Sequence, residues 1–176
     1  MHRHAAAIGA IAALALAGAA IAHAQAPGAD TADVGTIEAI VRASYEVISG
    51  PAGTPRQWRR DSTLYAPGAY FVATSERRGK TEVRILDTEE FRQRVDSGFV
   101  ANGFIEREIG SRIERFGNVA QVRSVYEARR SDDGPVIARG VNYFMLYWDG
   151  KRWWITAMVW DEERSSNRIP EAWIGA

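Results

Sequence analysis

The most constraining feature of the sequence is a series of three turn dipeptides in its second half. Gly117-Asn118, Asp133-Gly134 and Asp149-Gly150 interrupt long runs rich in β-branched and aromatic residues from Phe104 onward. Each pair suits a tight β-hairpin, because Gly, Asn and Asp tolerate the positive φ angles of such turns. The spacing predicts four strands of roughly 9 to 14 residues, longer than the usual five or six. Because long hairpin-connected strands twist and curl, we expect a concave sheet.

The first half of the chain has the pattern of helices. A helix is expected from Thr36 to the stop at Gly50-Pro51, and its buried face follows the i, i+3, i+4 spacing of Ile37, Ile40, Val41, Ser44 and Ile48. A second, short helix is expected from Pro55, with Trp58 as its apolar anchor. Helices followed by a strand meander predict an α+β fold, a cone-like, strongly curved antiparallel sheet wrapped around N-terminal helices.

Three local signals complete the expected fold of residues 36–176 as a single domain. Pro67-Gly68, between two short apolar runs, is the pair that a type II turn prefers and predicts a hairpin. Residues 76–80 are expected to form a charged turn. Asp87-Thr88-Glu89-Glu90 is a capping-box pattern and predicts a helix that continues through Val95.

The first 26 residues have the three-part pattern of a secretory signal peptide. A short basic start, Met1-His2-Arg3-His4, precedes an uncharged run from Ala5 to Ala22 that ends in small-x-small sites. We therefore expect cleavage after Ala24 or Ala26, a flexible leader over residues 27–35, and a periplasmic or secreted protein without a membrane segment after cleavage. A membrane anchor is the alternative interpretation, because the apolar run just reaches spanning length.

Composition limits the chemistry of the mature chain. The sequence has no Cys, and its three histidines, His2, His4 and His23, all lie in the expected signal peptide. Disulfides, thiolate nucleophiles and imidazole or Cys metal ligands are therefore not expected, and we predict neither a metal site nor a cofactor. Acidic and basic residues balance at 22 each, so no net charge attracts nucleic acid.

Side-chain alternation indicates which strand face lines the concavity. After Val119 the even positions, including Tyr126, are small or apolar, and the odd positions are mostly charged. A three-residue loop with Gly150 in the left-handed region would place Asn142 and Phe144 beside Met158 and Trp160, whereas a two-residue loop would pair Asn142 with Ala157. We favour the first arrangement. The predicted pocket residues are Tyr126, Asn142, Phe144, Trp154, Met158 and Trp160.

The last two strands are apolar on both faces, so both faces must be covered. One face is expected to contact the helices. The other is expected to contact a second subunit or the C-terminal segment that contains Ile169-Pro170-Glu171-Ala172-Trp173. A homodimer is the more economical of these two interpretations.

From about Val34 to Gly175 the chain resembles the NTF2-like superfamily, which includes ketosteroid isomerases. The resemblance rests on the amphipathic helix, on residues 64–72, on Trp153-Trp154-Ile155 and on Trp160; residues 104–108, 116–120, 139–142 and 149–155 resemble an uncharacterised bacterial branch. The resemblance implies that Trp160 corresponds to an aromatic residue that lines the isomerase cavity. It also implies that Asn142 corresponds to the acid that donates a hydrogen bond to the oxyanion.

Other isomerase positions do not match. The general-base aspartate falls near Ala73, and the tyrosine of the first helix falls near Ala43, whereas Tyr45 is expected to face differently. The isomerase mechanism is therefore not supported by the resemblance.

Three classes of function remain open. The first is a binding module that holds a small hydrophobic or aromatic molecule in a Trp-lined cavity. The second is a metal-free lyase or isomerase that uses carboxylate, Tyr or Asn side chains, and the third is a dimeric scaffold without a ligand. Trp154 and Trp160 suit either ligand stacking or core packing.

The charged clusters also have two interpretations each. The Asp161-Glu162-Glu163 run suits either a base at the cavity mouth or a solvated strand end, and the arginines of residues 56–60 suit either an anion site or a solvated helix face. Glu106 and Glu108 are expected to form cross-strand ion pairs.

Overall fold

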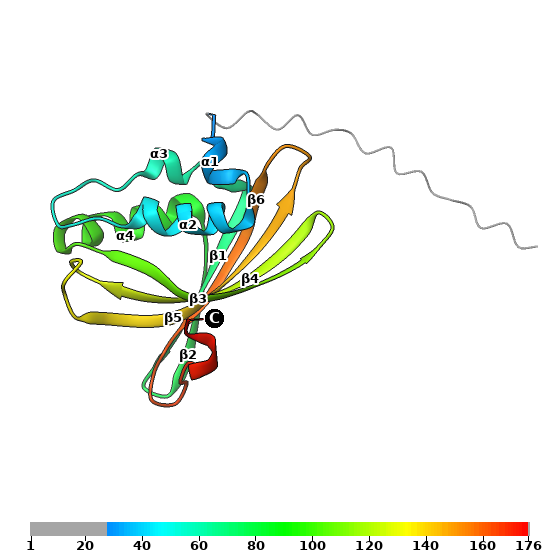
Figure 1. Ribbon diagram of the computed structural model, residues 1–176. Helices are drawn as coiled ribbons and strands as arrows, with labels where there is room; N and C mark the ends of the chain where they lie inside the picture. The colour runs from blue at the N-terminus through cyan, green and yellow to red at the C-terminus, as the bar shows by residue number, and fades with distance from the viewer. Residues whose placement is uncertain (1–27, 176) are drawn as a thin grey trace, which may run out of the picture.

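Helices lie over one face of a curved six-stranded sheet in the computed structural model, which describes residues 28–175 (Figure 1). The elements are, in chain order, α1 (Thr31–Val34), α2 (Ile37–Ile48), α3 (Trp58–Asp61), β1 (Tyr65–Arg77), β2 (Lys80–Asp87), α4 (Thr88–Asn102), β3 (Ile105–Phe116), β4 (Val119–Arg129), β5 (Val136–Trp148), β6 (Trp153–Glu162) and the 3-10 turn η1 (Glu171–Trp173). The α+β class and the helical layer on a curved sheet are as the sequence predicts.

The strand order is β2-β1-β6-β5-β4-β3. Strands β3 to β6 form the predicted antiparallel meander, with turns at the three predicted dipeptides. The pair β1–β6 is parallel, so the sheet is mixed and departs from a purely antiparallel one at this pair. The charged turn at residues 76–80 joins β1 to β2.

Two local predictions differ from the structure. Pro67-Gly68 does not form a hairpin: β1 continues through it, and Gly68, at φ +78°, accompanies a register shift against β6 between Tyr65 and Tyr70. The positive φ angle that a type II turn requires here serves a bulge instead. Helix α4 begins at the predicted capping box but continues seven residues beyond Val95, to Asn102.

The N-terminal region also differs from the prediction. The predicted signal peptide, residues 1–26, lies outside the described residues. Residues 31–34, expected to belong to a flexible leader, form helix α1, capped by the side chain of Asp30. Val34 is buried in the core and Asp33 accepts hydrogen bonds from Arg60, so tertiary contacts hold this segment. No helix within residues 28–175 has the length and apolar character of a membrane span.

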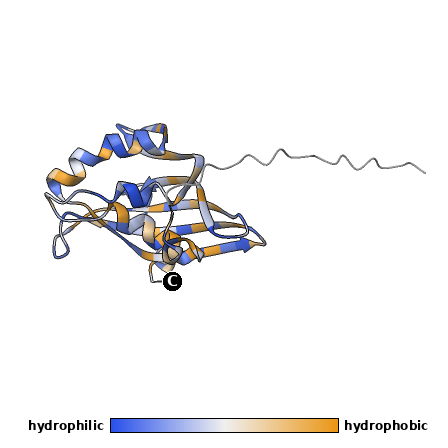
Figure 2. Ribbon diagram, turned by 90° about the horizontal axis from the view of Figure 1, so that it is seen from above, coloured by the Kyte–Doolittle hydropathy of each residue, from blue (hydrophilic) through white to orange (hydrophobic). Residues whose placement is uncertain are grey.

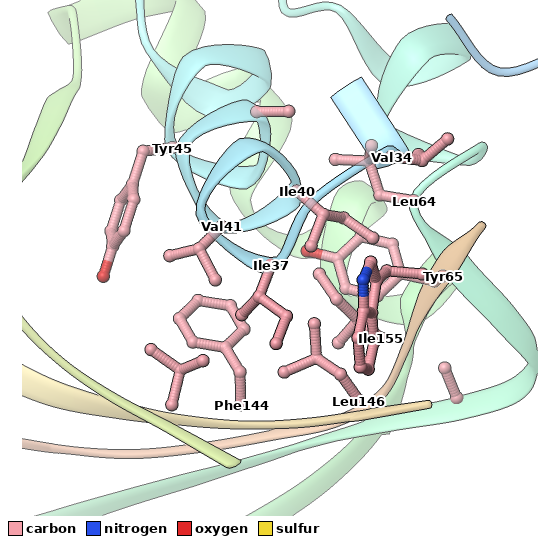
Figure 3. Packing of buried hydrophobic residues seen from close by; sticks show 14 of the residues in the cluster. Val34, Ile37, Ile40, Val41, Tyr45, Leu64, Tyr65, Phe144, Leu146 and Ile155 are labelled. Atoms are coloured by element: carbon pink, nitrogen blue, oxygen red, sulfur yellow. The ribbon is translucent and has the colours of Figure 1, made fainter. Parts of the chain in front are cut away.

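The core lies between α2 and the concave face of the sheet, as Figure 3 shows. Thr36 caps α2 through its side chain, which accepts a hydrogen bond from the backbone amide of Ala39. The apolar face of the helix then packs on Phe144, Leu146 and Ile155 of the sheet. Viewed from above, apolar and polar residues alternate along the strands (Figure 2), which is the pattern of a sheet whose faces have different neighbours.

The C-terminal segment crosses the convex face of the sheet. The guanidinium of Arg123 lies 3.9 Å from the ring centre of Trp173. The backbone amide of Gly175 donates to the carbonyl of Ile109 at 2.7 Å. This segment covers part of the outer face, while Met145 and Ile85 stay 44% and 70% exposed. The predicted homodimer therefore stays a prediction, because apolar residues outside the segment remain available to a second copy.

Candidate functional site

The predicted pocket residues fall into two groups. In the β5–β6 pair, Asn142 lies opposite Trp160, and Phe144 lies opposite Met158, the arrangement favoured from the sequence. A register shift between Met145 and Leu146 then places Tyr147 opposite Trp154. Because side chains alternate along a strand, Trp154 points away from the core face that its neighbour Ile155 occupies.

Trp154 is therefore separated from the other predicted residues. Its indole N–H donates to Asp149 at 2.8 Å, and the guanidinium of Arg152 lies 3.7 Å from its ring centre. The bulge changes which tryptophans face inward: Trp153 joins the core in place of Trp154.

Aromatic side chains pack the concave face beside Trp160. Phe71 of β1 and Phe91 of α4 lie edge to face with a centroid distance of 4.9 Å, and Trp160 contacts both at 6.3 and 6.1 Å. Trp160 thus belongs to the packing between α4 and the sheet. This part of the concavity is filled by side chains and does not provide a Trp-lined cavity on the helical side.

Polar side chains gather instead where the C-terminal half of α2 faces the sheet. The hydroxyl of Tyr45 points from α2 towards the strands (Figure 3) and lies 2.6 Å from the hydroxyl of Ser124. The side-chain amide of Asn142 donates to the Tyr45 hydroxyl at 3.0 Å and to the Glu106 carboxylate at 3.4 Å. Ser124 in turn donates to the carboxylate of Glu108. Five side chains from four elements therefore form one hydrogen-bonded cluster.

Tyr45 is the functional candidate that sequence reasoning missed. Its side chain was expected to face differently from the isomerase tyrosine, yet its hydroxyl accepts a hydrogen bond from Asn142. The signal was present in the sequence: Tyr45 lies four residues after Val41, on the same buried helix face.

Glu106 and Glu108 do not form the cross-strand ion pairs that were expected. Within residues 28–175, neither forms an ion pair with Arg or Lys. The start of β3 is tied to the end of α2, because the hydroxyl of Ser49 accepts from the Glu106 amide at 2.9 Å and donates to the Tyr45 carbonyl at 2.7 Å. This contact holds Glu106 beneath the helix.

Burial dominates the electrostatics of the cluster. It raises the pKa of Glu106 from 4.5 to about 8, although the hydrogen bond from Asn142 lowers it, and the charge of Glu162 adds a smaller upward contribution. Burial also raises the pKa of Tyr45, and so does the neighbouring charge of Glu106. Both groups therefore keep their protons at neutral pH.

A groove between α2 and the beginning of β3 gives access to the cluster. Its volume is about 460 Å³. Tyr45, Glu106 and Glu108 line it, together with Ser49 and Ile105. Asn142 and Ser124 lie directly behind this lining through their hydrogen bonds. A groove of this size accommodates a small molecule.

Comparison with known proteins addresses the fold. No family model matches the sequence, and no curated protein matches it. Among solved structures, the yeast Ubp3-associated protein Bre5 is 13% identical over 73% of this chain and 94% of its own, with a TM-score of 0.51. NTF2-like proteins of unknown function from Methylobacillus flagellatus and Silicibacter pomeroyi are 15% and 13% identical, each over 73% of this chain and over 95% and 94% of their own, with TM-scores of 0.46 and 0.47.

The fold of the chain is similar to that of Bre5. At these identities the likeness shows the fold alone, so any activity of the domain has to be argued from its own residues.

Two other candidate clusters are engaged in structural contacts. Arg56 donates to the backbone carbonyls of Gly50, Thr54 and Phe99, and Arg60 pairs with Asp33 and Glu46. These guanidiniums hold the helical layer together, so the predicted anion site has only Arg59 left. In the Asp161-Glu162-Glu163 run, Asp161 pairs with Arg164.

A second cavity of about 420 Å³ lies on the outer face of the sheet, beneath the C-terminal segment. Val141, Tyr143 and Val159 form its floor, and Ile169 and Trp173 form its roof; Trp160 also contributes to its lining. Residues 28–175 contain no group of three or more His, Asp or Glu side chains placed to hold a metal ion. The expected absence of a cofactor stays a prediction.

Proposed function

We propose that the NTF2-like domain binds a small molecule in the α2–β3 groove and transfers a proton to or from it, as a lyase or isomerase. The observation that carries this proposal is the buried Glu106 carboxyl, hydrogen-bonded to Asn142 and adjacent to the Tyr45 hydroxyl in an open groove. A carboxyl group, a phenol and an amide in contact provide both proton transfer and the orientation of a polar ligand.

The two carboxyl groups of the site have different environments. Glu106 has a pKa of about 8, so most of it is protonated at pH 7 and it acts as a general acid. Glu108 is exposed and accepts a hydrogen bond from Ser124. A buried and an exposed carboxyl group in one groove can divide the roles of acid and base, which elimination or isomerisation without imidazole requires.

A binding protein for a small hydrophobic or aromatic molecule is the second candidate. The outer cavity favours it, because its lining is mainly apolar and includes Tyr143, Trp160 and Trp173. In this alternative the ligand lies between the sheet and the C-terminal segment instead of under α2.

Export and dimer formation belong to the same proposal. The pattern of residues 1–26 supports secretion to the periplasm or beyond, and the exposed apolar residues of the convex face, among them Ile85 and Met145, support a homodimer. A dimer without any ligand would make the chain a scaffold. Native mass spectrometry of protein purified from periplasm measures the subunit number and any retained ligand together.

The catalytic proposal is tested with a library of small alcohols, amines, ketones and carboxylates. Binding is followed by saturation-transfer NMR and conversion by the appearance of product signals. Glu106→Gln keeps the size and the acceptor oxygen of the side chain but cannot transfer a proton, so it is expected to bind a converted compound and to abolish its conversion. Glu114→Gln, on the exposed part of the same strand, is the matched control. Conversion at an unchanged rate in Glu106→Gln would refute the proposed role.

A further inference from the structure

Strand β2 leaves one edge of the sheet open. It is the last strand in the order β2-β1-β6-β5-β4-β3, and its eight residues pair with β1 without a register shift. Figure 1 shows the β1–β2 hairpin projecting at the lower end of the molecule. Within residues 28–175, no other segment donates a backbone hydrogen bond to Thr81, Val83 or Ile85 or accepts one from them. An unpaired strand edge of this kind is a template for another strand.

The opposite edge of the sheet, strand β3, is protected against such pairing. Its register against β4 shifts between Glu108 and Gly110, and a bulge of this kind bends a strand. The backbone amide of Gly175 donates to the carbonyl of Ile109 in the same stretch, so the C-terminal segment also covers part of this edge. Bulges and covering segments keep strand edges from pairing, and β2 has neither.

The turn before β2 determines which of its backbone groups face the open edge. Residues 78 and 79 have φ angles of 53° and 72° and form a two-residue hairpin loop. Lys80, which follows this loop, therefore exchanges hydrogen bonds with β1, and such pairs alternate along an antiparallel ladder. The even-numbered residues of β2 thus direct their backbone groups towards β1, whereas Thr81, Val83 and Ile85 direct theirs outwards.

The charges of β2 suit one partner, a second copy of the same strand. Arg84 and Glu82 are 49% and 41% exposed, and their own contact, at 3.8 Å, is long for an ion pair. If Val83 lies opposite Val83 of a second copy, each Glu82 faces Arg84 of the other copy, and opposite charges across strands are favourable. The two adjacent registers place Glu82 opposite Glu82 or Arg84 opposite Arg84, and registers beyond these leave fewer residues paired. Charge complementarity therefore selects a single two-fold arrangement.

We propose that two copies of the chain join through β2 in an antiparallel pairing centred on Val83, which extends their two sheets into one. The inference rests on the proposed homodimer and identifies its interface. Thr81, Val83 and Ile85 exchange backbone hydrogen bonds with the second copy. Val83 and Ile85, 57% and 70% exposed in the single chain, form an apolar stripe with the same residues of the other copy. Glu82 and Arg84 occupy the non-hydrogen-bonded positions, where facing side chains are closest.

Cross-linking tests the register directly, because the chain contains no cysteine of its own. In the proposed pairing the two Val83 Cα atoms lie about 5.5 Å apart, within reach of a disulfide, whereas the two Ile85 Cα atoms lie roughly 13 Å apart. Because paired strands hold two thiols at an effective concentration on the order of millimolar, exported Val83→Cys protein at about 10 µM should form a disulfide-linked dimer about a hundredfold faster than Ile85→Cys. Ile85→Cys is the matched control, on the same face and at least as exposed. Equal rates, or faster cross-linking of Ile85→Cys, would overturn the inference.

Sedimentation velocity over a range of concentrations measures the dimer dissociation constant of charge variants. Glu82→Arg and Arg84→Glu each place like charges opposite one another twice in the dimer, and each should raise the dissociation constant about tenfold. The double variant Glu82→Arg with Arg84→Glu restores the opposite pairs and should return to the wild-type value. Glu114→Arg makes the same charge change on edge strand β3 and should have no effect. A wild-type dimer that all these variants leave unchanged would refute the β2 interface but not the homodimer, whereas a monomeric wild type would refute both.

Discussion

Replacing Glu106 with glutamine should make the protein more stable in mildly alkaline solution. In the folded chain the pKa of Glu106 is about 8, whereas its ordinary value is 4.5. The folded state therefore binds more protons than the unfolded state between these values, and the free energy of unfolding falls as pH rises through this window. The slope is about 1.4 kcal/mol per pH unit for one proton.

Only in the upper part of this pH range is the change in stability due to Glu106 separate from that of other groups. Burial raises the pKa of Asp61 to about 6 despite its ion pair with Arg92, so stability linked to Asp61 is lost at lower pH. Residues 28–175 contain no histidine. Between pH 6.5 and 8.5 the wild type should therefore lose about 2 kcal/mol through Glu106 alone.

Urea unfolding followed by tryptophan fluorescence at pH 6.5, 7.5 and 8.5 measures this loss. Glu106→Gln resembles the protonated acid and can still accept the hydrogen bond from Asn142, so its stability should stay constant over the range. Glu114→Gln, in an exposed ion pair with Arg112, should follow the wild type. A wild type whose stability does not change over this range, or a Glu106→Gln variant with the wild-type slope, would refute the reasoning.

Further predictions concern packing and processing. Gly140→Ala places a Cβ 2.5 Å from the Tyr126 hydroxyl and should cost about 1–3 kcal/mol in denaturant unfolding, whereas Gly98→Ala in α4 meets open space and should stabilise the protein by about 0.5–1 kcal/mol. Phe71→Ala removes a ring that is 1% exposed and should cost about 3–5 kcal/mol by the same measurement. Amino-terminal sequencing of protein exported by a Gram-negative host should find cleavage after Ala24 or Ala26; an intact chain in the periplasm would contradict the signal-peptide interpretation.

Much of the fold could be predicted because its signals are local. Turn dipeptides, the capping box at Asp87 and the apolar spacing of α2 each act within a few residues, so they indicate the same elements in any context. Alternation along a strand likewise placed Asn142, Phe144 and Trp160 on one face. The sequence by itself therefore determined the number of late strands, their order along the chain and most of the residues that face the helices.

Other features depended on contacts between distant segments. The role of Pro67-Gly68 as a bulge follows from the pairing of β1 with β6, far along the chain. The sheet face on which Trp154 lies is set by a register shift between β5 and β6, and no dipeptide in the sequence indicates this shift.

The candidate site depended most on tertiary structure. Glu106 looks like an ordinary surface residue in an alternating charged strand, and only the approach of α2 removes water from its carboxyl group. The same approach brings Tyr45 to Asn142, 97 residues away in sequence. Local patterns determine where a side chain points along its own element, whereas its solvation and its hydrogen-bond partners are set by whichever elements fold against it.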